Sequence, residues 1–168
     1  MYIDNQRNFI WEKQEFSPAL SAMHIMSNFD LSDDDKTLLV NVLNLFGLWE
    51  HNHPVPGGTE RISVLVLSMS GSVNVHLESN TVGQANTMFL IRWERILALS
   101  RPDPDVLFAL KMAILLEEMC HALYMIRDEY LVKEYVIQIV QQAYPKITLH
   151  DLFPVAFDKN NQRILESL

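Results

Sequence analysis

The stretch that decides the fold is Asp105–Ile126, "DVLFALKMAILLEEMCHALYMI". Its apolar residues fill so many positions that they cover almost the whole circumference of a helix, and such a helix is buried on most sides. The polar residues within it are Lys111, Glu117, Glu118 and His121. Three of these lie close together near the end of the stretch. A buried polar group needs either a chemical role or a partner.

Helix signals occur on both sides of this stretch. Ser17 and Pro18 predict a short helix start, because serine caps helices and proline fits their first position. A second start is predicted at Ser32, which precedes three aspartates that suit the positive end of the helix dipole. Helical patterns are also present at Gln84–Leu99 and Glu129–Ala143. Most of the chain is therefore expected to be helical.

The middle of the chain has a different pattern. The segment "RISVLVLSMSGSVNVHLES", residues 61–79, contains a β-branched run, a Ser/Gly turn at Ser70–Ser72 and a clean alternation of apolar and polar residues after it. Alternation with a period of two is typical of a half-buried strand. The segment predicts a β hairpin.

These elements predict a mainly helical α+β fold with a small hairpin or sheet. The length of 168 residues and the apolar content of 49% suit one domain over residues 1–168. No repeat or low-complexity tract divides the chain. We therefore expect a single globular domain.

Composition excludes several classes of protein. Thirteen Lys and Arg against twenty-one Asp and Glu give a net charge of −8, and no basic cluster stands out, so we expect no nucleic-acid partner. The longest apolar run, residues 106–116, is interrupted by Lys111 and predicts no membrane span. Cys120 is the sole cysteine. The absence of a disulfide framework and of a secretory signal at the N-terminus predicts a cytoplasmic protein.

The polar residues of the central helix form the strongest site candidate. Glu117 and His121 are four residues apart, so they lie one turn apart on the same face. Two side chains at this spacing are able to converge on one metal ion, while the residue after the first ligand points to a neighbouring position. This predicts Glu117 and His121 as metal ligands and Glu118 beside them.

The segment "LLEEMCHAL" resembles the active-site helix of zinc metallopeptidases of the HExxH type, and most of all the SprT-like group. The resemblance covers about ten residues. It implies that His121 stands at the second zinc-binding histidine and Glu118 at the general base. Glu117 occupies the place of the first zinc-binding histidine, which is absent. The resemblance also implies a zincin-like scaffold, zinc as the cofactor and peptide hydrolysis as the reaction.

A third ligand would have to come from further along the chain. Glutamate binds zinc through oxygen, so Glu129, Glu134 and His150 are the candidates to complete a site with Glu117 and His121. Adjacent glutamates lower the net charge around an ion and oppose the acidification of bound water that hydrolysis requires.

Core electrostatics offers a different explanation of the same polar residues. A Lys111–Glu118 or Glu117–His121 ion pair would satisfy them without any ligand, because buried charges persist when they are paired.

Glu50 and His53 repeat the Glu-x-x-His spacing of di-iron bundles, but His53 abuts Pro54 and is expected to lie past its helix. Cys120 is expected to be a buried structural thiol.

Two functions follow from these alternatives. The missing first histidine favours a non-catalytic binding protein that interacts with a protein partner, on a scaffold that resembles a degenerate zincin. The alternative is a zinc-dependent, metallopeptidase-like hydrolase, with Glu118 as catalytic base and Glu117 and His121 as metal ligands.

Overall fold

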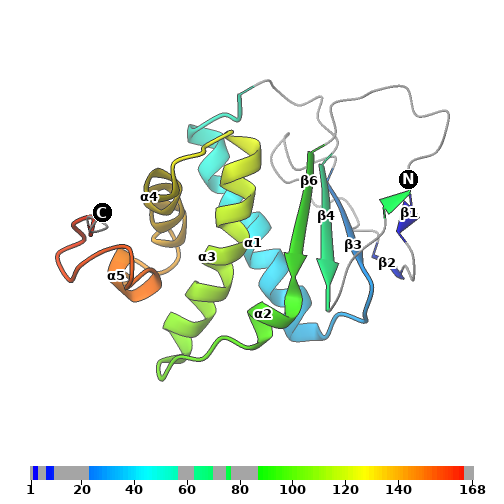
Figure 1. Cartoon of the computed structure of the whole chain (residues 1–168), viewed down its shortest axis with the longest axis horizontal. Coiled ribbons are helices and arrows are strands. Elements are labelled where there is room, and N and C mark those ends of the chain that lie inside the picture. The colour runs from blue at the N-terminus through cyan, green and yellow to red at the C-terminus, as the bar shows by residue number, and fades with distance from the viewer. Residues whose placement is uncertain are drawn as a thin grey trace. The chain divides into compact units, whose positions relative to one another are not determined.

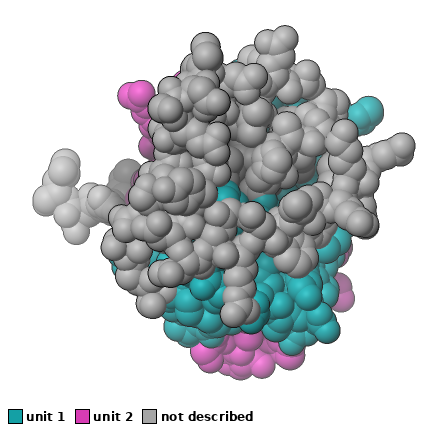
Figure 2. Space-filling model, turned by 90° about the vertical axis from the view of Figure 1, so that its right-hand side faces the viewer, with its two compact units in different colours: residues 1–98 teal, residues 99–168 magenta. Residues whose placement is uncertain are grey.

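The computed structural model describes residues 2–3, 7–9, 23–56, 63–69, 75–76 and 87–164. The chain divides into two compact units, residues 1–98 and residues 99–168, which are coloured separately in Figure 2. The prediction of a single domain over 1–168 remains a prediction.

The described residues of the first unit form the strands and two helices, which Figure 1 labels in chain order. Their bounds are β1 Tyr2–Ile3, β2 Arg7–Phe9, β3 Met23–Ser27, α1 Asp33–Asn52, β4 Ser63–Ser68, β5 Val75–His76, β6 Thr87–Arg92 and α2 Trp93–Leu97. The main sheet has the order β2-β3-β4-β6. Strands β3, β4 and β6 are parallel to one another, and β2 is antiparallel to β3.

The three parallel strands contribute buried apolar side chains to the first unit. Leu65 on β4 is paired in register with Ile25 on β3 and with Phe89 on β6. Ile25, Leu65 and Leu67 are buried. Strands buried in this way read as continuous apolar runs, as in "SVLVLS" at residues 63–68.

The structure corrects three predictions about this unit. Met23–Ser27, which follows the predicted helix start at Ser17 and Pro18, is a strand, while Ser17 and Pro18 themselves lie outside the described residues. The predicted hairpin does not form, since β4 pairs on both edges with β3 and β6, and β5 pairs with β1 in another sheet. The predicted helix Gln84–Leu99 is a strand at Thr87–Arg92 and helical only at Trp93–Leu97.

Helix α1 begins as the sequence predicts. The Ser32 hydroxyl accepts a hydrogen bond from the Asp35 amide, and the Asp35 carboxylate accepts one from the Ser32 amide. This capping box satisfies amides that a helix N-terminus otherwise leaves without partners. The indole of Trp93, the first residue of α2, donates to Asp35 at 3.0 Å. The cap of α1 therefore also anchors α2.

As far as the structure describes it, the second unit has three helices, α3 Pro104–Leu123, α4 Glu129–Val140 and α5 Leu149–Leu152. Figure 1 shows α4 beside α3, and α5 contacts both. Most of the long apolar side chains of α3 are buried, as predicted; the buried members are Leu110, Met112, Leu115, Leu116, Met119 and Leu123. The core of this unit runs along α3.

Helix α3 ends earlier than predicted, at Leu123 instead of Ile126. Tyr124 caps the helix, and Met125 takes a left-handed backbone conformation with φ of 57°. A left-handed residue stops a right-handed helix and reverses the chain. Asp128 then caps α4 by accepting hydrogen bonds from the amides of Tyr130 and Leu131. The tight connection brings the start of α4 back beside the end of α3.

The segment after α5 packs on α4. Phe157 is fully buried, and its ring meets Tyr130 edge to face with centroids 5.9 Å apart. The Tyr130 hydroxyl donates to the Ile164 carbonyl at 3.1 Å. Arg163 lies over the Tyr130 ring and pairs with Glu134.

The predicted fold class, α+β and mainly helical with a small sheet, is confirmed. Among the described residues, no helix combines the length and the apolar character needed to cross a membrane.

Candidate functional site

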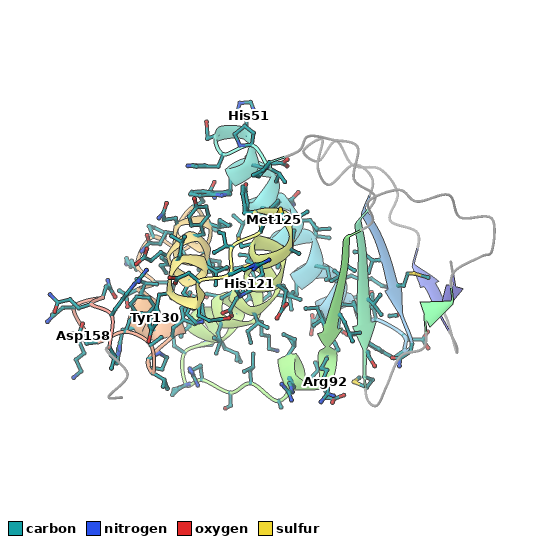
Figure 3. All side chains as sticks on the ribbon, turned by 45° about the horizontal axis from the view of Figure 1, so that its top comes forward. His51, Arg92, His121, Met125, Tyr130 and Asp158 are labelled. Carbon is teal, nitrogen blue, oxygen red and sulfur yellow. The ribbon has the colours of Figure 1, made fainter. Side chains whose placement is uncertain are left out.

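The chain reversal after α3 fixes the orientation of His121. Its Nδ1 atom lies 2.6 Å from the Ile126 carbonyl oxygen. Because a carbonyl oxygen only accepts hydrogen bonds, Nδ1 carries a proton and donates. The other ring nitrogen, Nε2, faces Glu129 and lies 3.6 Å from its Oε1 atom. Figure 3 labels His121 on α3 and Tyr130, the neighbour of Glu129, in the first turn of α4.

Three side chains at this junction present atoms that bind metals. One atom each from Glu117, His121 and Glu129 lie within 4.8 Å of one another. The side chain of Glu117 is 19% exposed and that of His121 25%, whereas Glu129 is 66% exposed. Helix α3 supplies two of the three groups, and the capped first turn of α4 supplies the third. The structure thus brings together the two predicted ligands and one of the three candidates for a third.

Lys133 brings a positive charge into the same cluster. Its Nζ lies 2.9 Å from Glu117 Oε1 and 3.0 Å from Glu129 Oε2, and it also donates to the Glu129 backbone carbonyl at 3.2 Å. The lysine side chain is only 16% exposed, and its Nζ lies 5.6 Å from the centre of the Phe153 ring. We call Glu117, His121, Glu129 and Lys133 the junction cluster.

The environment of Lys133 favours its charged form. Burial alone would lower the pKa of this lysine, but hydrogen bonds and Coulomb attraction from Glu117 and Glu129 together outweigh it and raise the pKa. The ammonium is therefore present at neutral pH and compensates the two carboxylates. The junction cluster holds its own cation.

Glu118, the predicted base, does not belong to the group formed by Glu117, His121 and Glu129. It is exposed. Partial burial raises the pKa of its carboxyl group, with smaller contributions from Glu117 and Glu129 that also raise it and from His121 that lowers it. A raised carboxyl pKa fits a base in a catalytic site, and it equally fits an acidic residue beside two others.

The ion pairs differ from those that the sequence suggested. Glu117 pairs with Lys133 instead of His121, and the Nε2 atom of His121 lies beside Glu129. In each pair the partner comes from α4. The prediction considered partners on α3 alone, and helix-to-helix pairing across a tight turn was missed. The available signal was the Glu129–Lys133 spacing of four, which brings both side chains to one face of α4.

The other two candidates for a third ligand have different roles. Glu134 pairs with Arg163 at 3.4 Å. The Nδ1 atom of His150 lies 3.0 Å from the Phe157 carbonyl oxygen, so this histidine ties α5 to the C-terminal segment. Each of the two residues therefore has its partner in the segment after α5.

Cys120 is buried, which confirms the predicted structural thiol. Burial, assisted by the charge of Glu117, raises the pKa of its thiol to about 12. The thiolate is the reactive form of cysteine, and it is almost absent at neutral pH with such a pKa. Cys120 therefore contributes packing to α3.

In the first unit, His53 caps the end of α1, as its position before Pro54 predicts. Its ring stacks on Trp49 with centroids 3.6 Å apart. Within the described ranges, neither Glu50 nor His53 belongs to a group of three metal-binding side chains. The further carboxylates considered for a di-iron site are Glu12, Glu15 and Glu94. Glu12 and Glu15 lie outside those ranges, and Glu94 does not belong to such a group either.

Comparison of the chain with family models, with curated proteins and with solved structures gives no match. The function is therefore argued from the junction cluster itself.

Proposed function

We propose that this chain is a non-catalytic binding protein of the cytoplasm that interacts with a protein partner. The observation that carries the proposal is the Lys133 ammonium, which lies 2.9 Å from Glu117 and 3.0 Å from Glu129. An intramolecular cation stands among the carboxylates that a metal ion would need. The cluster then links α3 and α4 through ion pairs, and the protein functions by binding a partner at its surface.

The charge balance supports this role. A catalytic zinc ion lowers the pKa of bound water because its positive charge is only partly compensated. Two carboxylates from Glu117 and Glu129 would neutralise a divalent ion. An ion would also have to displace Lys133 and break both of its ion pairs. These are poor conditions for hydrolysis and good ones for a stable helix junction.

One experiment on the purified full chain tests the absence of catalysis. Its metal content is measured together with hydrolysis of an unfolded protein substrate, with and without added Zn²⁺, in the native chain and in Glu118→Gln. The proposal expects substoichiometric metal and no difference between the two chains. Stoichiometric zinc with hydrolysis that Glu118→Gln abolishes would overturn it.

Binding is tested separately at the exposed apolar side chains of the second unit. Isolated exposed apolar residues are ordinary, but a partner buries such area on binding. The large exposed apolar side chains of this unit are Met125, Leu131, Val155 and Ile164. Val155 is 89% exposed. A photo-reactive residue at each position, in the full chain in its own cells, is expected to give a discrete adduct. Adducts no different from those of a probe at exposed Gln138 would contradict the binding role.

A metal-dependent hydrolase is the second candidate, and one observation favours it. The Nδ1–H of His121 donates to a backbone carbonyl, which is how a metal-binding histidine is commonly held while its Nε2 faces the ion. In this candidate Glu117, His121 and Glu129 bind zinc, and Glu118 is the base. The metal and hydrolysis measurements above decide between the two functions.

A further inference from the structure

The orientation of His121 leaves its Nε2 atom facing a carboxylate. The Nδ1 atom donates to the Ile126 carbonyl, and Nε2 lies 3.6 Å from Glu129 Oε1. An imidazole nitrogen and a carboxylate oxygen this close are able to bind one metal ion between them. The local geometry is therefore suited to a cation.

A second observation is that the cluster already accommodates a positive charge. The Lys133 ammonium contacts two of the three residues, Glu117 and Glu129, at 2.9 and 3.0 Å. From these two observations we infer that the junction cluster is a cation-exchange site, in which a divalent ion of the Zn²⁺ class displaces the Lys133 ammonium. This goes beyond the proposed function, because binding the ion requires no catalysis.

The donor set defines the class of ion. Two carboxylate oxygens and one imidazole nitrogen suit Zn²⁺ and Co²⁺, whereas Mg²⁺ and Ca²⁺ prefer oxygen alone. Zinc bonds of about 2.0–2.2 Å in a tetrahedral site place neighbouring donor atoms about 3.5 Å apart. The three donors here lie within 4.8 Å of one another, so small side-chain rotations would close the site. Most of that movement falls to Glu129, the most exposed of the three.

Lys133 controls the affinity of the site. In the exchange, the carboxylates of Glu117 and Glu129 release the ammonium and bind the metal, and the lysine turns toward solvent without any change of covalent bonds. Removing the lysine charge abolishes this competition. Without the lysine charge, the metal-free form no longer has the two ion pairs that a metal ion must break. Metal binding is therefore expected to become about tenfold tighter or more.

The test is a Co²⁺ titration of the purified full chain, followed by the visible absorption of the bound ion. Native protein is expected to bind one Co²⁺ weakly, Lys133→Met to bind it about tenfold more tightly, and Lys133→Arg to resemble native. His121→Ala should abolish binding. Glu134→Gln, a matched change on α4 outside the cluster, should leave it unaltered, and Mg²⁺ should not compete.

Several outcomes would overturn the inference. Equal affinity in the native chain and Lys133→Met would remove the lysine as competitor, and binding that survives His121→Ala would place the ion elsewhere. If Lys133→Met does not fold, as circular dichroism would show, the native chain still decides: no Co²⁺ binding, or binding unaffected by His121→Ala, contradicts the site. Because the readout is absorption, Co²⁺ binding without hydrolysis supports the inference and leaves the proposed function standing.

Discussion

At the scale of single residues, Lys133 determines what the junction cluster is. Glu117 and His121 on α3 are the two residues that sequence spacing singles out, and neither reveals which cation they face. The lysine lies sixteen residues beyond Glu117 and reaches it only because the chain reverses between the helices. The charge of this one ammonium group thereby balances the carboxylates of a candidate metal site.

Replacing this ammonium should destabilise the chain. Lys133→Met is expected to lower the free energy of unfolding by about 1–3 kcal/mol, because it leaves the partly buried carboxylate of Glu117 without its partner. The measurement is urea unfolding at pH 7 in the presence of a chelator. Lys146→Met, at an exposed lysine, is the control and should change little. Equal effects of the two substitutions would contradict the proposal that Lys133 links α3 and α4 through ion pairs.

Glu118 gives a prediction that depends on pH. Burial raises the pKa of its carboxyl group above the ordinary value of 4.5, so folding favours the protonated form. Well below pH 4.5 the group is protonated in both states, and Glu118→Gln should have little effect. As the pH rises through the raised pKa, the native chain loses the stability that it gains from the protonated carboxyl group of Glu118. Glu118→Gln should then be the more stable protein, by under about 1 kcal/mol at pH 7, since solvent screens an exposed group. A destabilised variant at pH 7 would be inconsistent with this assignment.

Cys120 provides a chemical test of burial. With a thiol pKa of about 12 it should resist iodoacetamide at pH 8 in the native chain and react fully in urea. Mass spectrometry of the intact protein measures both states. Rapid labelling of the native chain would show that this face of α3 is open to solvent.

At the scale of elements, the helices were predictable where they carry local signals, and so were the extended segments of β4 and β5, whereas β3, β6 and the strand pairing were not. Helices α1 and α4 have capping residues, Ser32 and Asp128, immediately before them. Strands β3 and β6 lie in segments whose apolar spacing also fits a helix, and only their pairing with β4 decides the outcome. Pairing between distant segments overrides local propensity and is not visible in a short window of sequence.

The core of the second unit predicts a clear contrast between two leucines. Leu116 on α3 is fully buried, and Leu116→Ala should cost about 2–5 kcal/mol through lost burial and the cavity that remains. Leu131 on α4 is 39% exposed, and Leu131→Ala should cost under about 1 kcal/mol. Denaturant unfolding of both variants measures the difference. Similar costs would mean that α3 is not the centre of this core.

At the scale of the whole molecule, the sequence predicted the fold class and much of the candidate site. Glu117, His121 and Glu129 were all named from residue type and spacing, and the structure places them together. The resident lysine was missed, because its position depends on the left-handed turn at Met125 and on the cap at Asp128. Residue spacing within one helix is readable from sequence, whereas the approach of two helices depends on the connection between them.

The central claim is that the protein's own ammonium, and not a metal ion, holds the junction of α3 and α4 together. The most direct measurement is the melting temperature of the full chain, purified without added metal, before and after treatment with a strong chelator. We predict the same melting temperature in both samples, because Lys133 supplies the charge that an ion would otherwise provide. A clear fall in melting temperature after chelation, reversed by Zn²⁺, would contradict the claim.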